Sequence, residues 1–120
     1  MKILARTEHF NPKYDLKLVC SCGCGNSVSQ GLLDRVELVR RLFGKPMRVT
    51  SGYRCEAYNK KVGGAKNSMH LTGNAVDIAC TDSSDRARLI RLGLHAGMSI
   101  GIREDMIHFD IRPHQIVFTY

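Results

Sequence analysis

The chain has 120 residues, of which 43% are hydrophobic and 24% charged, and this globular composition excludes a disordered or collagen-like chain. At this length there is room for one hydrophobic core, so we expect a single domain over residues 1–120. The net charge of +7 favours an anionic partner, but the basic residues are scattered and no aromatic residues alternate with them. Charge alone does not choose among nucleic acid, an acidic glycopolymer and a lipid surface, and most of it is expected to be a solvated face. Without alternating aromatic residues, we expect no nucleic acid as the partner.

The apolar runs are short. None approaches the roughly 20 residues that a membrane span needs, so no span is expected. Residues 1–10 alternate charged and apolar positions and lack the apolar centre of a signal peptide. We expect a protein that is made in the cytoplasm without a signal peptide and that either stays there or leaves by another route.

The first regular element is expected after an irregular segment, residues 1–26. Ser27 and Gln30 fit a capping box, and Gly44 and Pro46 are typical of a helix end. Between them, apolar residues recur at helical spacing and define one buried face: Leu32, Val36, Val39 and Phe43.

The middle of the chain alternates short strands and helices. Residues 47–50 and 74–80 read as strands, and residues 55–61 as a short helix. A second long helix is expected to begin near Asp82 and to end at Gly97. Its expected buried stripe consists of Ala87, Ile90 and Leu94.

The tail, residues 99–120, alternates apolar and polar positions in the manner of strands. The short links between its apolar runs predict antiparallel hairpins. Helices early in the chain and strands late in it predict a small α+β domain, in which an antiparallel sheet has flanking helices.

Polar residues with ligand chemistry are concentrated in two of these segments. His70 and Asp77 lie seven residues apart, and Asp77 falls on a strand face between alanines, a poor core position unless something cationic meets it. His108 and Asp110 share a strand face whose opposite side is apolar. This arrangement indicates the lining of a site.

His70, Asp77 and His108 can supply three ligands to zinc and leave the fourth position open, as in catalytic zinc sites. Zinc lowers the pKa of bound water to roughly 7, and a carboxylate can then act as general base. Asp105 and Asp110 are the candidates for that base. The alternative is structural: a loop-capping His70, an Asp77 paired with a cation, and His108 at the surface.

Several motifs follow one another along roughly residues 9–112: Cys20-Ser-Cys-Gly-Cys-Gly25, Ser51-Gly-Tyr-Arg-Cys55, Asn59, Val62-Gly-Gly-Ala65, Ser68-x-His70-x-x-Gly73-x-Ala75-x-Asp77 and His108-x-Asp110-x-Arg112. In these motifs and their order, the chain resembles the M15-type zinc peptidases that act on bacterial cell-wall peptides, among them D-Ala-D-Ala carboxypeptidases and phage endolysins.

The resemblance implies a fold shared with hedgehog-type domains and DD-peptidases, in which an antiparallel sheet forms a zinc cleft. It implies Zn²⁺ as cofactor, with His70, Asp77 and His108 as ligands. Arg54 would bind a substrate carboxylate or the tetrahedral intermediate, and Ser68 would lie beside the substrate.

One position departs from the better-known relatives, which carry Glu three residues before the last His. Here that residue is Asp105, which is one methylene shorter. Asp110 follows the His-x-Asp pattern of the most similar subfamily, where it is either the base or a group that orients a ligand. We expect Asp105 to be the base, ahead of Asp110.

The cysteines allow two interpretations. Cys20, Cys22 and Cys24, together with Cys55, are four thiols or the ligands of a second zinc ion. The spacing Cys-x-Cys-x-Cys is tighter than the usual C-x₂-C hairpin and favours thiols. Cys80, at the end of a strand, is expected in the core.

The leading functional prediction is hydrolysis of peptide bonds in peptidoglycan stem peptides, either as a carboxypeptidase or as an endolysin-type endopeptidase. The site of action would be the cell wall, reached through phage-mediated release if the protein is a phage lysin, and a monomer is expected. The alternatives are a non-catalytic zinc-containing wall-binding or virion module and, less favoured, a basic nucleic-acid protein built on the cysteine-rich loop. The sequence does not select the bond that is cut.

Overall fold

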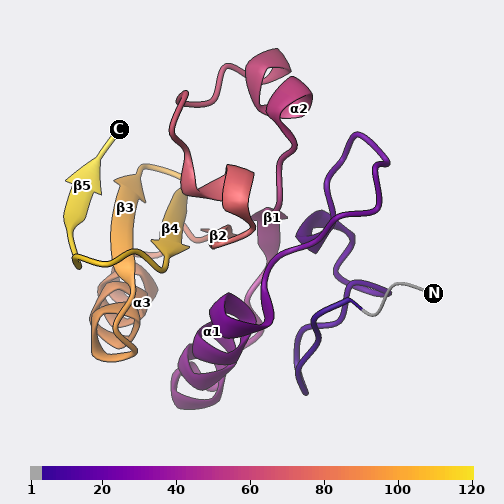
Figure 1. The fold of residues 1–120 in the computed structure, drawn as a ribbon. Helices are drawn as coiled ribbons and strands as arrows, with labels where there is room; N and C mark the ends of the chain where they lie inside the picture. The colour runs from indigo at the N-terminus through magenta and orange to yellow at the C-terminus, as the bar shows by residue number, and fades with distance from the viewer. Residues whose placement is uncertain (1–3) are drawn as a thin grey trace.

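The computed structural model describes residues 4–120. Residues 1–3, which belong to the segment expected to lack a signal peptide, lie outside the described residues. One mixed sheet in the order β1-β2-β4-β3-β5 organises the fold, with the long helices on one side and the short α2 and η2 on the other (Figure 1). The elements are η1 (Leu16–Leu18), α1 (Gln30–Phe43), β1 (Val49–Ser51), α2 (Glu56–Lys61), η2 (Met69–Thr72), β2 (Ala75–Ala79), α3 (Ser83–His95), β3 (Ser99–Arg103), β4 (Met106–Asp110) and β5 (Val117–Thr119). The prediction of a small α+β domain is confirmed.

α1 begins two residues later than the capping box predicted. Ser29, not Ser27, is the N-cap, and its hydroxyl accepts a hydrogen bond from the Leu32 amide. Ser27 instead pairs with Val19 in an isolated bridge and donates its hydroxyl to the Leu18 carbonyl. The predicted C-terminus is correct, because Gly44 adopts the left-handed conformation of a helix end. The predicted buried face, Leu32, Val36, Val39 and Phe43, is in the core.

α3 begins where Asp82 caps it, as predicted, but its buried face is different. Leu89 and Gly93 are the buried positions, whereas Ala87 is exposed. Gly93 allows this close approach to the sheet, because a Cβ there would lie 2.4 Å from a ring carbon of Phe109. The predicted buried face of α3 is wrong at Ala87. Several sides of the helix carry apolar residues, and packing against the sheet decides which side is buried.

The sheet brings together strands that are far apart in the sequence. β4 lies between β2 and β3 and is antiparallel to both, with Asp77 opposite His108. The predicted hairpin between β3 and β4 is confirmed, but β5 is parallel to β3. Because β2 and β3 occupy both edges of β4, β5 cannot pair with β4. It pairs instead with the free edge of β3 and runs in the same direction as that strand.

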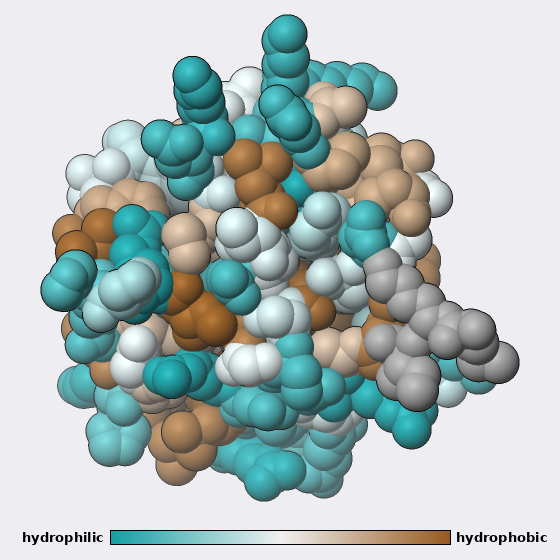
Figure 2. Space-filling view, in the orientation of Figure 1, coloured by the Kyte–Doolittle hydropathy of each residue, from teal (hydrophilic) through white to brown (hydrophobic). Residues whose placement is uncertain are grey.

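The two faces of β4 have opposite chemistry. Ile107 and Phe109 are fully buried in the core against α1 and α3, whereas His108 and Asp110 point to the other face. At the surface, hydrophilic side chains cover most of the face seen in Figure 2, and apolar side chains appear there in separate patches. Within residues 4–120, no helix has the length and apolarity that crossing a membrane requires.

A buried carboxylate on α1 ties the N-terminal segment to the domain. Glu37 accepts the backbone N–H of His9 at 2.7 Å, pairs with the His9 ring, and lies 3.3 Å from Arg41 Nε. Burial alone would raise the pKa of Glu37. The polar groups of Thr7 and His9 beside it outweigh burial and lower the pKa from 4.5 to about 2.

We expect this contact to make the free energy of unfolding depend on pH in the acidic range. Because the pKa of Glu37 is lower in the folded state, its contribution is complete above pH 4.5 and is lost as the pH falls towards about 2. The measurement is the free energy of unfolding by urea across that range for the wild type and Glu37→Gln. The difference between the two proteins should shrink with falling pH, and a constant difference would contradict the assignment. The exposed Glu8→Gln is the matched control.

Candidate active site

Three predicted ligand residues meet on the polar face of the sheet. Asp77 on β2 faces His108 on β4, and the 3₁₀ turn η2 places His70 beside both. His108 Nδ1 lies 2.8 Å from Asp77 Oδ1, and His70 Nε2 lies 3.3 Å from the same oxygen. The three side chains are 3%, 8% and 4% exposed for His70, Asp77 and His108, so they form a buried polar group.

The orientation of His70 is set by a backbone carbonyl. Its Nδ1 donates to the Gly52 carbonyl at 2.7 Å, so that in the neutral ring Nε2 is the acceptor nitrogen, and Nε2 faces Asp77. Gly52 must approach closely to do this, because a Cβ there would lie 2.6 Å from the Lys17 carbonyl oxygen. Nε2 is buried without a hydrogen-bond partner. A buried acceptor of this kind is costly unless a cation or donor meets it.

His108 is held from behind by a carboxylate. Its Nε2 lies 2.7 Å from Asp110 Oδ2, and Asp110 in turn accepts two hydrogen bonds from the guanidinium of Arg112. With Nε2 donating to Asp110, Nδ1 is the nitrogen that faces Asp77 and can act as a ligand. A carboxylate behind a metal-binding histidine is a common arrangement that fixes the ring and raises its basicity.

These residues fit a zinc ion. One donor atom from each of His70, Asp77 and His108 lies within 4.8 Å of the others. Two imidazole nitrogens and one carboxylate oxygen are a donor set typical of catalytic zinc, with a fourth position left for water or substrate. The buried, unpartnered Nε2 of His70 is the observation that most directly calls for a cation.

The charges of the group support one another. Burial raises the pKa of Asp77, but its contacts with His108 and His70 outweigh burial and hold it well below the usual range. Asp110 is likewise lowered, because Arg112 and His108 outweigh burial. The pKa of His108 is raised, since Asp110 and Asp77 more than offset its burial. Both carboxylates are therefore ionised at neutral pH.

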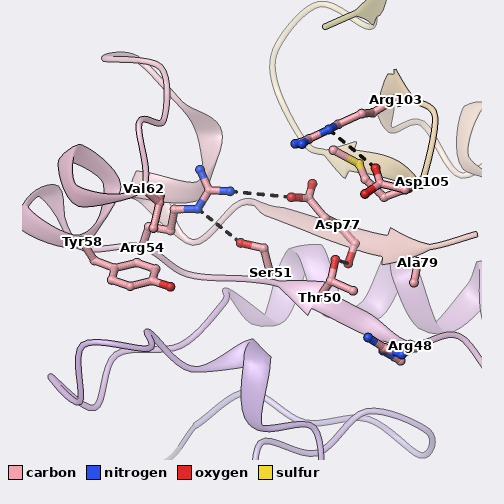
Figure 3. A pocket seen from close by; sticks show the side chains of 11 residues that line it. Arg48, Thr50, Ser51, Arg54, Tyr58, Val62, Asp77, Ala79, Arg103 and Asp105 are labelled. Carbon is pink, nitrogen blue, oxygen red and sulfur yellow. Dashed lines mark hydrogen bonds and ion pairs between the residues drawn. The ribbon is translucent and has the colours of Figure 1, made fainter.

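Arg54 reaches this group from the segment between β1 and α2. Its Nη2 lies 3.7 Å from Asp77 Oδ2, and its Nε donates to the Ser51 hydroxyl at 3.2 Å (Figure 3). Nη1 donates to Asn59 Oδ1 at 3.2 Å. Gly64 is needed for this contact, because a Cβ there would lie 2.0 Å from the same Asn59 oxygen. Arg54 is thus aimed at the site by contacts on three sides.

The two candidate bases occupy different environments. Asp110 is fully buried, with both oxygens engaged by Arg112 and His108. Asp105 lies at the β3–β4 turn with a side chain 64% exposed, 3.6 Å from Arg103 Nε. It lines a hollow of about 470 Å³ together with Arg54 and Asp77, as Figure 3 shows. Of the two, only Asp105 is open to a molecule in this hollow.

A cleft of about 580 Å³ runs over the ligand residues themselves. Ser68 lines it and caps η2 by accepting the His70 amide at 3.2 Å. The sequence patterns indicate no role for several other residues that line or support the cleft, namely Asn59, Arg112, Phe118 and Tyr120. The alternating pattern of the tail places Phe118 and Tyr120 on one face of a strand. It does not show that β5 pairs with β3 and brings both residues to the cleft.

The comparisons with known proteins agree with this geometry. The family model described as Peptidase M15 matches residues 8–110. The chain belongs to the peptidase M15 family. Among solved structures, it is similar to an L-Ala D-Glu endopeptidase, ChiX, from Serratia marcescens, with a TM-score of 0.50 and 20% sequence identity. That match covers 71% of this chain and 80% of the other, and it supports the fold. No curated protein sequence matches the chain.

As an M15 peptidase, this chain carries its ligand residues within the matched region, since His70, Asp77 and His108 all fall between residues 8 and 110. Arg112 lies just outside the matched region and extends the site through Asp110.

Proposed function

We propose that this M15 peptidase is a zinc enzyme that hydrolyses peptide bonds in peptidoglycan stem peptides. The observation that carries the proposal is the convergence of His70, Asp77 and His108, with an unpartnered buried nitrogen on His70, beneath an open cleft. These three residues would hold the ion. Zinc in such a site lowers the pKa of a bound water to about 7 and polarises the carbonyl of the scissile bond.

The protein's own groups divide the remaining work. Asp105, exposed in the hollow that Arg54 and Asp77 also line, accepts the proton of the attacking water and delivers it to the leaving amine. Asp110 is not the base in this proposal, because Arg112 and His108 occupy its oxygens. It orients His108 instead.

Arg54 and Ser68 bind the substrate in this proposal. The Arg54 guanidinium lies beside Asp77, and both residues line the hollow as well as the cleft. There it can bind a substrate carboxylate or stabilise a developing oxyanion. Stem peptides carry such carboxylates, and the net charge of +7 favours approach to an anionic wall. The similar ChiX fold is that of an L-Ala D-Glu endopeptidase, which favours an endopeptidase over a carboxypeptidase.

We further propose that residues 1–120 act as one M15-like domain, as a monomer and on the cell wall. The single core shared by α1, α3 and the sheet supports one domain. Release through a phage-made membrane lesion stays a prediction.

The test is digestion of purified sacculi and of defined stem peptides, with mass spectrometry of the products. The zinc-loaded protein should release fragments, and a chelator should stop the release until zinc is returned. New amino-terminal D-Glu would identify an endopeptidase, and free D-Ala a carboxypeptidase. Binding to sacculi without any new amino terminus would contradict hydrolysis and support a wall-binding module.

A further inference from the structure

Four cysteines gather at a place separate from the proposed active site. Cys20, Cys22 and Cys24 lie in the loop between η1 and α1, and Cys55 is the N-cap residue of α2. The four Sγ atoms all lie within 4.8 Å of one another. Cys22 Sγ is 3.3 Å from Cys20 Sγ and 3.4 Å from Cys55 Sγ. Two segments more than 30 residues apart thus bring four thiols to one point.

The backbone around the sulfurs is shaped to hold them. The loop closes where the Cys20 amide donates to the Asn26 carbonyl at 2.8 Å, and Gly23 and Gly25 adopt positive φ angles that other residues rarely adopt. The Cys55 amide donates to Cys20 Sγ at 3.3 Å, and the Tyr58 amide donates to Cys55 Sγ at 3.4 Å. Backbone donors directed at sulfur stabilise thiolates, the form that binds metal.

The number and spacing of the sulfurs favour one ion over disulfides. Tetrahedral zinc with Zn–S bonds of about 2.3 Å separates its sulfurs by about 3.8 Å, close to the spacing seen here. Disulfides join sulfurs two by two at about 2.0 Å, whereas Cys22 Sγ has two sulfur neighbours, at 3.3 and 3.4 Å. Free thiols would be held together only by weak S–H contacts.

We propose that Cys20, Cys22, Cys24 and Cys55 bind a structural Zn²⁺ ion. Four protein ligands fill the coordination sphere, so this second site has no open position for substrate. Its role is mechanical. It fastens the 20–26 loop to the segment that leads from β1 into α2 (Figure 1).

That segment carries two contacts of the proposed active site. Gly52 accepts from the His70 ring, and the amide of Arg54, next to Cys55, donates to the His70 carbonyl at 3.0 Å. A tetrahedral thiolate site at Cys55 would therefore hold the segment that orients His70 and Arg54. Neither the family match nor the similar structure assigns a function to these cysteines.

The first experiment is metal analysis by mass spectrometry of the full chain purified under reducing conditions. We expect about two zinc ions per chain in the wild type, if both sites fill, and about one in Cys22→Ser/Cys24→Ser and in His70→Ala. Cys80→Ser, which alters the cysteine outside the cluster, should leave the content unchanged. Iron in place of zinc, or a metal content that the double cysteine variant does not lower, would overturn the proposal.

A second measurement does not depend on folded variants. Cobalt added to the metal-free wild type should produce an intense sulfur-to-metal charge-transfer band, and zinc should protect four of the five cysteines from alkylation, leaving Cys80 to react. Absence of the band, or a disulfide among the four in the reduced protein, would overturn the site. His70→Ala should keep the band, so failure of the catalytic zinc and failure of this site are distinguishable.

Discussion

Alanine in place of His70 is expected to remove the proposed catalytic zinc and to lower kcat/KM on a stem peptide by about 10³-fold or more. The reason is that the ligand set falls to Asp77 and His108, and losing several kcal/mol of transition-state stabilisation corresponds to a factor of this size. Zinc content and kcat/KM are measured on the same preparation. Thermal unfolding is recorded as well, because His70 is buried.

The matched control is His95→Ala, which alters an exposed histidine at the end of α3. It should keep zinc content and kcat/KM at wild-type values. Near-normal hydrolysis by a folded His70→Ala protein would remove the basis of the zinc proposal.

Asp105→Ala is expected to lower kcat by about 10²- to 10⁴-fold while zinc stays bound. The side-chain ion pair of Asp105 with Arg103 is exposed, and its backbone carbonyl, which accepts from the Cys80 amide, is kept in the variant. The substitution should therefore leave the fold and the ligand residues intact. Asp105→Glu should recover part of the activity, because it restores a carboxylate with a longer reach. Glu104→Ala, at the exposed neighbouring position, is the control.

Asp110→Ala should behave differently. Its removal leaves His108 and Arg112 without their shared partner, so we expect zinc affinity to fall by about 10- to 100-fold and the protein to be less stable. Saturating zinc should then restore much of the activity. If instead Asp110→Ala keeps zinc tightly but loses turnover, and Asp105→Ala is active, the two roles are reversed.

The local elements could largely be predicted from the sequence. The apolar spacing of residues 32–43 and the glycine after them are enough to specify α1, because a helix is built from contacts between near neighbours. The sequence does not distinguish Ser27 from Ser29 as the N-cap of α1, because serine is a good cap at either position. In the structure Ser27 pairs with Val19, and Ser29 caps the helix. Ala87 is exposed, against expectation, because helical periodicity does not reveal on which side of α3 the sheet lies.

The separation of polar and apolar faces on β4 was also readable, since side chains alternate along a strand. It put His108 and Asp110 on one face, but it could not say that Asp110 lies behind the histidine. That distinction rests on Arg112, which lies beyond the strand and reaches back to Asp110.

By itself, the sequence determined the α+β class, the positions of the long helices and most strands, and membership of a family through its ordered motifs. Tertiary structure alone decided the rest: the parallel pairing of β5, the shared carboxylate between His70 and His108, and the meeting of Cys55 with the 20–26 loop. The physical reason is distance along the chain. Helix and strand patterns arise from residues within a few positions, whereas a ligand set requires segments tens of residues apart to pack in one particular arrangement around a common core.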